Sequence, residues 1–106
     1  MSDKITVLDG KNFKQFISSG VTLVDYWASW CGPCRMVAPI LELVAEKIGD
    51  KAKIGKVNVD ENAELSNAAA VSAIPNLCIY KNGKLVDRIV GVVPQEQIVA
   101  LIEKYL

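Results

Sequence analysis

The sequence predicts an α/β domain in which a central mixed sheet is covered by helices on both faces. Strand and helix patterns alternate in the order β-α-β-α-β-α-β-β-α, one strand is apolar along nearly its whole length, and an Asn-Gly pair marks a hairpin. A chain of 106 residues that is 51% hydrophobic can bury a core of its own. We therefore expect residues 1–106 to form a single domain.

The first half of the chain contains two strand and helix pairs. Residues 5–7 form a short candidate strand, and Asp9 is expected to cap a helix through NFKQFIS. Residues 21–28, VTLVDYWA, are β-branched, aromatic and almost continuously apolar, which places this strand near the centre of the sheet. The next segment has apolar residues at helical spacing, at positions 37, 40, 41, 44, 45 and 48. Gly49 ends this helix, and Pro39 should kink it.

The second half adds strands of both orientations. Residues 53–60 alternate like a strand, and residues 62–71, NAELSNAAAV, are predicted to be helical. Two apolar runs within 76–91 flank Asn82-Gly83, the strongest short hairpin signal. The last segment is a helix with Pro94 in its opening turn and a buried stripe of Ile98, Leu101, Ile102 and Tyr105. The βαβ part favours parallel pairing, and the hairpin adds antiparallel strands.

Charge and composition exclude some partners. The chain has 12 basic and 12 acidic residues, so no net charge attracts it to nucleic acid or to an anionic membrane. No segment approaches the roughly 18 apolar residues of a membrane span. The start, MSDKITVLDG, does not resemble a signal peptide. We therefore expect a cytoplasmic protein, or an organelle protein if an import peptide has been removed.

Two cysteines are separated only by Gly32 and Pro33 in the motif WCGPC. If the long helix begins at Cys31, the Cβ atoms of Cys31 and Cys34 lie on one face, roughly 5 to 6 Å apart. A disulfide needs roughly 3.5 to 4.5 Å. A small adjustment of the first turn therefore lets the pair be either bonded or reduced, as a reversible redox switch requires.

The helix start also distinguishes the two sulfurs. A free cysteine has a pKa near 8.5, so only about 3% is thiolate at neutral pH. Unpaired first-turn amides and the helix dipole should lower the pKa of Cys31, and Arg35 adds a positive charge. Cys34 lies deeper in the turn and should be less exposed and less acidic. We therefore predict that Cys31 is the nucleophile and Cys34 the resolving cysteine, while Gly32 gives access and Pro33 stiffens the turn.

A metal site and an inert structural disulfide are the alternatives for this pair. Structural zinc takes four ligands, commonly Cys and His, whereas this chain has one further cysteine, Cys78, and no histidine. We therefore expect no metal. An odd cysteine count argues against a secreted disulfide framework. Cys78 falls inside a strand, where a small buried apolar role is expected and a regulatory thiol is the minor alternative.

Several segments together resemble the thioredoxin family. They are VDYWASWCGPCR, NVDEN, AIPN and YKNGK, and the resemblance runs from FKQFI to the final helix. It implies the thioredoxin fold and a cis bond between Ile74 and Pro75 in a loop beside Cys31. The backbone of Ile74 would then be able to pair with an extended substrate segment.

The resemblance also assigns an acid and a docking surface. An aspartate within a buried strand needs a partner or a task, and Asp25 matches the family's buried proton acceptor for Cys34. Lys56 matches the lysine that tunes this acid. Alternatively, Asp25 is a paired structural acid and Lys56 a solvated strand residue.

Five residues match the family's flat apolar surface around the reactive sulfur: Trp30, Gly32, Pro33, Ile74 and Gly91. Pro75, which has no N–H and helps keep the loop edge open, is assigned to substrate binding with Trp30, Ile74 and Gly91. Trp27 is expected to pack beneath the helix instead of touching substrate. Several positions depart from the family pattern. Arg35 replaces a common lysine, Asn76 replaces a common threonine beside the docking loop, and Cys78 is an additional cysteine. With Asn76, Ser72 and Ala73 change the rim of the docking surface.

The sequence and the resemblance together predict a protein disulfide reductase that serves electron transfer and cell redox homeostasis. The partners implied are disulfide-containing proteins and a thioredoxin reductase, either a flavoenzyme that uses NADPH or a ferredoxin-linked enzyme. No bound cofactor is expected, because the chain has no dinucleotide fingerprint, and the protein is expected to be a monomer. The alternatives are a docking module without redox chemistry, a metal-binding domain, and an oxidase or isomerase of an oxidising compartment.

Overall fold

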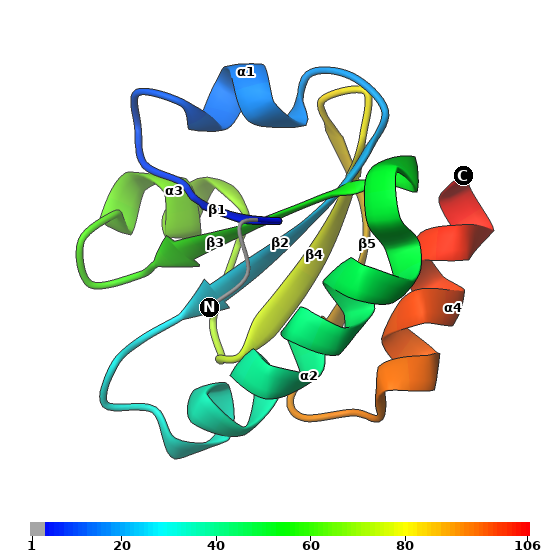
Figure 1. The fold of residues 1–106 in the computed structure, drawn as a ribbon. Helices are drawn as coiled ribbons and strands as arrows, with labels where there is room; N and C mark the ends of the chain where they lie inside the picture. The colour runs from blue at the N-terminus through cyan, green and yellow to red at the C-terminus, as the bar shows by residue number, and fades with distance from the viewer. Residues whose placement is uncertain (1–3) are drawn as a thin grey trace.

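The computed structural model describes residues 4–106. Its elements follow the predicted order (Figure 1). They are β1 (Ile5–Val7), α1 (Phe13–Ile17), β2 (Val21–Trp27), α2 (Gly32–Ile48), a short 3₁₀ helix (Gly49–Lys51), β3 (Lys53–Asn58), α3 (Ala63–Ala68), β4 (Asn76–Lys81), β5 (Lys84–Val90) and α4 (Gln95–Tyr105).

One five-stranded mixed sheet forms the centre of the molecule, in the order β1-β3-β2-β4-β5. β2 is parallel to β3 and antiparallel to β4, so the apolar strand lies in the middle as predicted. β1 is parallel to β3, and β4 and β5 form the antiparallel hairpin. The C-terminal end of β2 therefore lies beside the start of β4, and α2 begins just beyond it (Figure 1).

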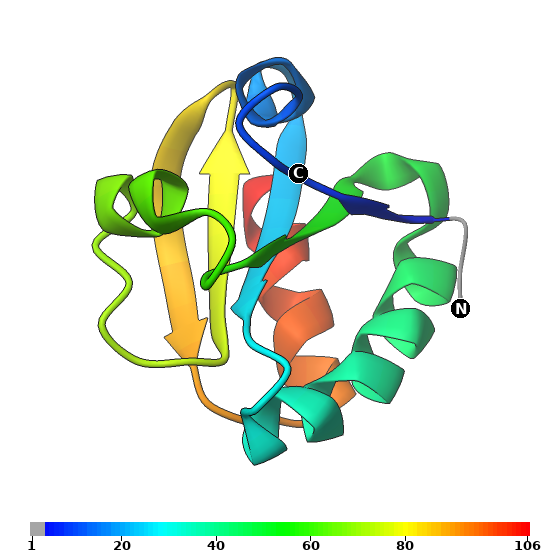
Figure 2. The ribbon, with the colours of Figure 1, turned by 90° about the vertical axis from the view of Figure 1, so that its left-hand side faces the viewer.

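Helices cover both faces of the sheet (Figure 2). Side chains alternate along β2, so Leu23 packs into the core that includes α2 and α4, whereas Val24 packs into the core beside α1 and α3. Residues 23–25 in the middle of β2 are each at most 2% exposed. Each large apolar side chain buried in this way contributes roughly 1.5 to 3 kcal/mol. Asp25 lies on the same side of β2 as Leu23, the side covered by α2.

Two helix boundaries differ from those that the sequence predicted. Asp9 does not cap α1; its carboxylate accepts the backbone N–H of Lys11 at 2.8 Å, in a turn that precedes the helix. α3 is only six residues long, shorter than the predicted 62–71. It ends because Ala70 adopts a left-handed conformation, with φ of 56°. α2 runs continuously through Pro39 to Ile48, where Gly49 ends it as predicted.

The turn of the β4–β5 hairpin lies at the end of the sheet far from the start of α2, and α4 packs beside α2 (Figure 1). Asn82 and Gly83 both have positive φ, 51° and 86°, as a two-residue type I′ turn requires. The Asn82 side chain accepts the backbone N–H of Gly20 at 2.8 Å. Among residues 4–106, no helix is both long enough and apolar enough to cross a membrane.

Candidate active site

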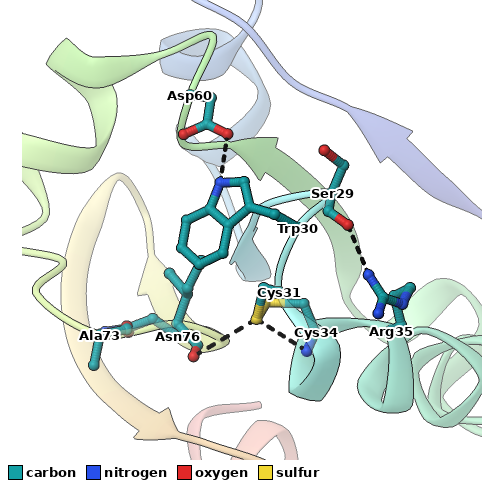
Figure 3. Close-up of a disulfide and its surroundings, with 9 residues drawn as sticks. Ser29, Trp30, Cys31, Cys34, Arg35, Asp60, Ala73 and Asn76 are labelled. Atoms are coloured by element: carbon teal, nitrogen blue, oxygen red, sulfur yellow. Dashed lines mark hydrogen bonds between the residues drawn. A yellow bond between two sulfur atoms is a disulfide. The ribbon is translucent and has the colours of Figure 1, made fainter.

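Cys31 is the N-cap residue of α2, and its sulfur takes the place of the usual cap oxygen. Its backbone is extended, with φ of −89° and ψ of 110°, and the N–H of Cys34 points to Cys31 Sγ at 3.2 Å (Figure 3). Pro33 lacks an N–H, so its own position adds no unpaired amide to this first turn. The helix start therefore directs a hydrogen-bond donor at the sulfur that the sequence predicted to be nucleophilic.

Cys31 and Cys34 form a disulfide, with Cα atoms 5.3 Å apart. This separation lies within the range of ordinary disulfides. The predicted difference in exposure is wrong for this bonded form, because Cys31 is 4% exposed and Cys34 is 3% exposed. Both sulfurs pack in a small apolar cluster with Ala28, against which Trp27, Val59 and Ile74 lie. Position in the helix, and not exposure, is what distinguishes the two cysteines here.

Two side chains are fixed beside the pair (Figure 3). The guanidinium of Arg35 donates to the carbonyl of Ser29 at 2.8 Å, which holds its charge next to the loop before Cys31. Trp30 is 66% exposed, and its indole N–H donates to a carboxylate oxygen of Asp60 at 2.8 Å. Sequence reasoning gave Asp60 no role, although it lies within the NVDEN motif.

The loop between α3 and β4 approaches the disulfide. The Ile74–Pro75 bond is cis, as the resemblance implied, and the carbonyl oxygen of Ile74 lies 3.9 Å from Cys31 Sγ. Gly91 has φ of 95°, and its N–H donates to the carbonyl of Pro75 at 2.9 Å. The structure thus brings Trp30, Ile74, Pro75 and Gly91 to one end of the sheet, around the cysteine pair.

A mostly apolar pocket of about 180 Å³ adjoins this loop. It is lined by Trp30, Val59, Ser66, Val71, Ser72, Ala73 and Ile74. The sequence assigned Trp30 and Ile74 to the docking surface and Ser72 and Ala73 to its rim. Val59, which follows β3, and Ser66 and Val71, from α3 and the loop after it, were not predicted. No local motif indicates that such residues converge.

Asp25 is buried in β2, opposite Lys56 of β3 in the sheet register. It is 2% exposed, and its Oδ1 has no hydrogen-bond partner. Burial raises the pKa of Asp25 from 3.8 to about 7, and the positive charge of Lys56 partly offsets this rise. The Lys56 ammonium lies 4.9 Å from the centre of the Trp27 ring, a cation–π contact. Trp27 is half-buried and packs against the cysteine pair, as expected.

Cys78 is fully buried in β4 on the opposite side of the sheet. Its thiol donates to Asn76 Oδ1 at 3.3 Å. Burial raises the pKa of this thiol to about 11, so it is protonated at neutral pH. These features agree with the buried role predicted for Cys78.

Within residues 4–106, no three His, Cys, Asp or Glu side chains are grouped closely enough to hold a metal ion. A cysteine pair at the start of a helix, beside a cis-proline loop and above a buried acid, defines a thiol–disulfide oxidoreductase.

Comparison with known proteins identifies the particular family. The thioredoxin family model matches residues 4–104, and the chain belongs to this family. It is 46% identical to a thioredoxin of Staphylococcus saprophyticus over 96% of this chain and 98% of that protein. It is 45% identical to a thioredoxin of Bacillus subtilis over 91% of this chain and 92% of that protein. A mutant thioredoxin from Halobacterium salinarum has the same fold, with a TM-score of 0.89, 34% identity, and coverage of 97% of this chain and 91% of that one.

The function follows from this membership and from the cysteine geometry. The chain is a thiol–disulfide oxidoreductase that reduces protein disulfides, and the Cys31–Cys34 pair is its redox-active disulfide centre. The predicted α/β thioredoxin fold is confirmed.

Proposed function

We propose that Cys31 is the attacking cysteine and Cys34 the resolving one. The thiolate of Cys31 displaces one sulfur of a substrate disulfide as a thiolate and forms a mixed disulfide with the other. Cys34, once deprotonated, attacks Cys31 Sγ and releases the second substrate thiol. The substrate gains two electrons and two protons, and the pair becomes the disulfide. The single observation that carries this assignment is the Cys34 N–H directed at Cys31 Sγ at 3.2 Å.

Asp25 accepts the proton of Cys34 in this mechanism, and water bridges the two groups. A carboxyl whose pKa is about 7 is close to half ionised at neutral pH, so it can both take up and release a proton. Lys56 tunes this acid, because its charge lowers a pKa that burial raises. The Asp25 oxygen that lacks a partner is available for such a transfer.

Protein substrates dock on the surface formed by Trp30, Ile74, Pro75 and Gly91. The backbone of Ile74 pairs with an extended substrate segment, and its closeness to Cys31 Sγ supports this role. Gly91 has room for an approaching backbone, since no atom lies within 4 Å of where its Cβ would be. Gly32 and Pro33 tune the active site by keeping the sulfur accessible and the turn rigid.

Residues 1–106 act as one domain and as a monomer in the cytoplasm, without a bound cofactor. The partners are disulfide-containing proteins and a thioredoxin reductase, either an NADPH-dependent flavoenzyme or a ferredoxin-linked one. The thioredoxin relatives support these partners.

Equilibration with glutathione buffers tests the assignment of reductase. We expect a reduction potential for the Cys31–Cys34 couple far below that of strong oxidants, and a potential close to theirs would contradict the assignment. Alkylation of the reduced protein at neutral pH tests the separate roles. Cys31 should react much faster than Cys34 and Cys78, and equal rates would discredit them.

A further inference from the structure

We propose that Arg88 and Asn76 are positioning residues that hold residues 69–75 in place beside Cys31 for the docking of protein disulfides. This inference rests on the proposed docking role of Ile74. It concerns neither the cysteines nor the acid, but the support of the loop that a protein substrate must meet.

Arg88 anchors the beginning of the segment. It lies in β5 opposite Cys78, and its side chain reaches the end of α3. Nη2 donates to the carbonyl of Ala69 at 2.7 Å, and Nη1 donates to the carbonyl of Ala70 at 3.5 Å. Carbonyls at a helix end have no partner within the helix, and an arginine can satisfy them. Because Ala70 adopts a left-handed φ that alanine rarely takes, this anchor stabilises an unusual exit from the helix.

Asn76 anchors the end of the segment and joins it to Arg88. The side chain is 2% exposed, and its Nδ2 donates to the carbonyl of Ala73 at 3.2 Å. Its Oδ1 accepts from Arg88 Nη1 at 3.5 Å and from the Cys78 thiol at 3.3 Å. A buried amide with partners on both ends is costly to disturb, because any lost partner leaves a polar group unpaired.

The functional surfaces lie between these two anchors. Residues 71–74 form one wall of the pocket that Trp30 closes on the other side. The last residue of this wall, Ile74, has its carbonyl oxygen 3.9 Å from Cys31 Sγ. Neither helix nor strand spans residues 71–75. Two backbone hydrogen bonds, from Val71 N–H to the carbonyl of Ser66 and from Gly91 N–H to the carbonyl of Pro75, act together with the two side-chain anchors to hold this segment.

This arrangement predicts a difference between substrates. A protein disulfide must fit against the pocket wall and the Ile74 backbone, and a displaced wall misaligns it for attack. A small disulfide only has to reach the sulfur. Loss of the anchors should therefore slow the reduction of a protein disulfide more than that of a small one.

The test compares two substrates with one protein preparation. The reduced protein, freed of other reductants, is mixed rapidly with excess insulin or with hydroxyethyl disulfide, and the second-order rate constants are compared. We expect Arg88→Met to lower the ratio of the insulin rate to the hydroxyethyl disulfide rate about fivefold, the size of one lost hydrogen bond. Arg88→Lys, which keeps one donor, should recover part of this ratio. Lys84→Met removes the same charge from the far end of β5 and should leave the ratio unchanged.

Partial unfolding would reduce the active fraction for both substrates equally and would not change the ratio. An unchanged ratio in Arg88→Met, or an equal ratio change in Lys84→Met, would overturn the inference. Asn76→Ala provides a second variant, for which the ratio should fall in the same direction. If the wild-type protein reduced hydroxyethyl disulfide but not insulin, the proposed docking of proteins would itself fail, which is a different result.

Discussion

Cysteines occupy two different environments on opposite sides of the central strands. Cys31 and Cys34 lie at the start of α2, on the side of the sheet that Asp25 faces. Cys78 lies on the α3 side, and it belongs with Asn76 and Arg88 to a group that we call the Asn76 cluster. The two sites share residue types and depth of burial, yet only the Cys31–Cys34 pair forms a disulfide, while Cys78 is a free thiol.

The difference lies in what each buried polar group has for a partner. In the Asn76 cluster, the thiol, the amide and the guanidinium bond to one another or to backbone carbonyls, so burial favours a protonated, unreactive thiol. Near the cysteine pair, Asp25 Oδ1 has no partner, and an amide points at Cys31 Sγ instead. An unsatisfied group is costly in free energy, but it remains available for reaction.

The largest expected effect comes from exchanging cysteine for serine at each site. Cys34→Ser should lower the turnover of a protein disulfide by about a thousandfold or more, because an external thiol must replace an intramolecular one. A mixed disulfide at Cys31 should accumulate and be visible by mass spectrometry. Cys78→Ser should keep its turnover, since a serine hydroxyl can also donate to Asn76 Oδ1. A Cys34→Ser protein that turned over normally would remove the distinction between the sites.

The second effect is the pH dependence that Asp25 gives to stability. Its pKa rises from 3.8 to about 7 on folding, so the folded protein binds more protons between these values. The contribution of Asp25 to stability should therefore be largest below about pH 4, fall by up to about 4 kcal/mol as the pH rises towards 7, and then level off. Asp25→Asn should remove this fall, so that the variant is more stable than the wild type at about pH 8. Urea unfolding at several pH values measures the difference.

Asp87 provides the control for this experiment. It is a partly exposed acid whose pKa is lowered, first by the hydrogen bond from Tyr105 and then by the backbone N–H of Arg88. Its stabilising effect is present above its unfolded pKa and is lost only as the pH falls below it. Asp87→Asn should therefore leave the slope between about pH 5 and 8 unchanged. A wild-type slope that Asp25→Asn also retained would mean that Asp25 is not the titrating group.

The sequence predicted the site around Cys31 and Cys34 better than it predicted the Asn76 cluster. A short motif encodes the cysteine pair and its helix start, and Asp25 is conspicuous as an acid within an apolar strand. Alternating periods and the Asn-Gly turn likewise predicted the order of the elements along the chain and the antiparallel hairpin, because they report which face of each element is buried.

The remaining features depend on contacts between distant segments. Arg88 meets the end of α3 only because β5 lies beside β4, and nothing near Arg88 in the sequence indicates this. The bond from Trp30 to Asp60 joins residues 30 positions apart. The premature end of α3 depends on the left-handed Ala70, which an alanine-rich segment does not suggest. The equal burial of both cysteines follows from packing by Val59 and Ile74, which comes from outside the motif.

A smaller effect tests how strongly the buried polar groups on the α3 side of the sheet depend on their hydrogen-bond partners. The hydroxyls of Tyr26 and Tyr80 share a buried hydrogen bond of 2.7 Å, on the same side of the sheet as the Asn76 cluster. Tyr26→Phe leaves the Tyr80 hydroxyl without this partner and should cost about 1 to 3 kcal/mol in the free energy of unfolding. Tyr26→Phe combined with Tyr80→Phe should cost clearly less than the sum of the single variants, because no polar group is left unpaired. Additive costs in chemical denaturation would show that the pair is not a coupled unit.

The smallest effect concerns Trp30, which closes the pocket between the two sites. Its indole N–H bonds to Asp60 at an exposed position, where a hydrogen bond contributes little net free energy. Asp60→Ala should lower the rate with insulin only about twofold to threefold, because the indole becomes free to leave the pocket wall. Asp60→Asn keeps an acceptor oxygen and should retain most of the rate, although it removes the same charge. If both variants lost equal activity, the carboxylate charge and not the position of Trp30 would be responsible, and this side of the pocket would contribute to docking through electrostatics.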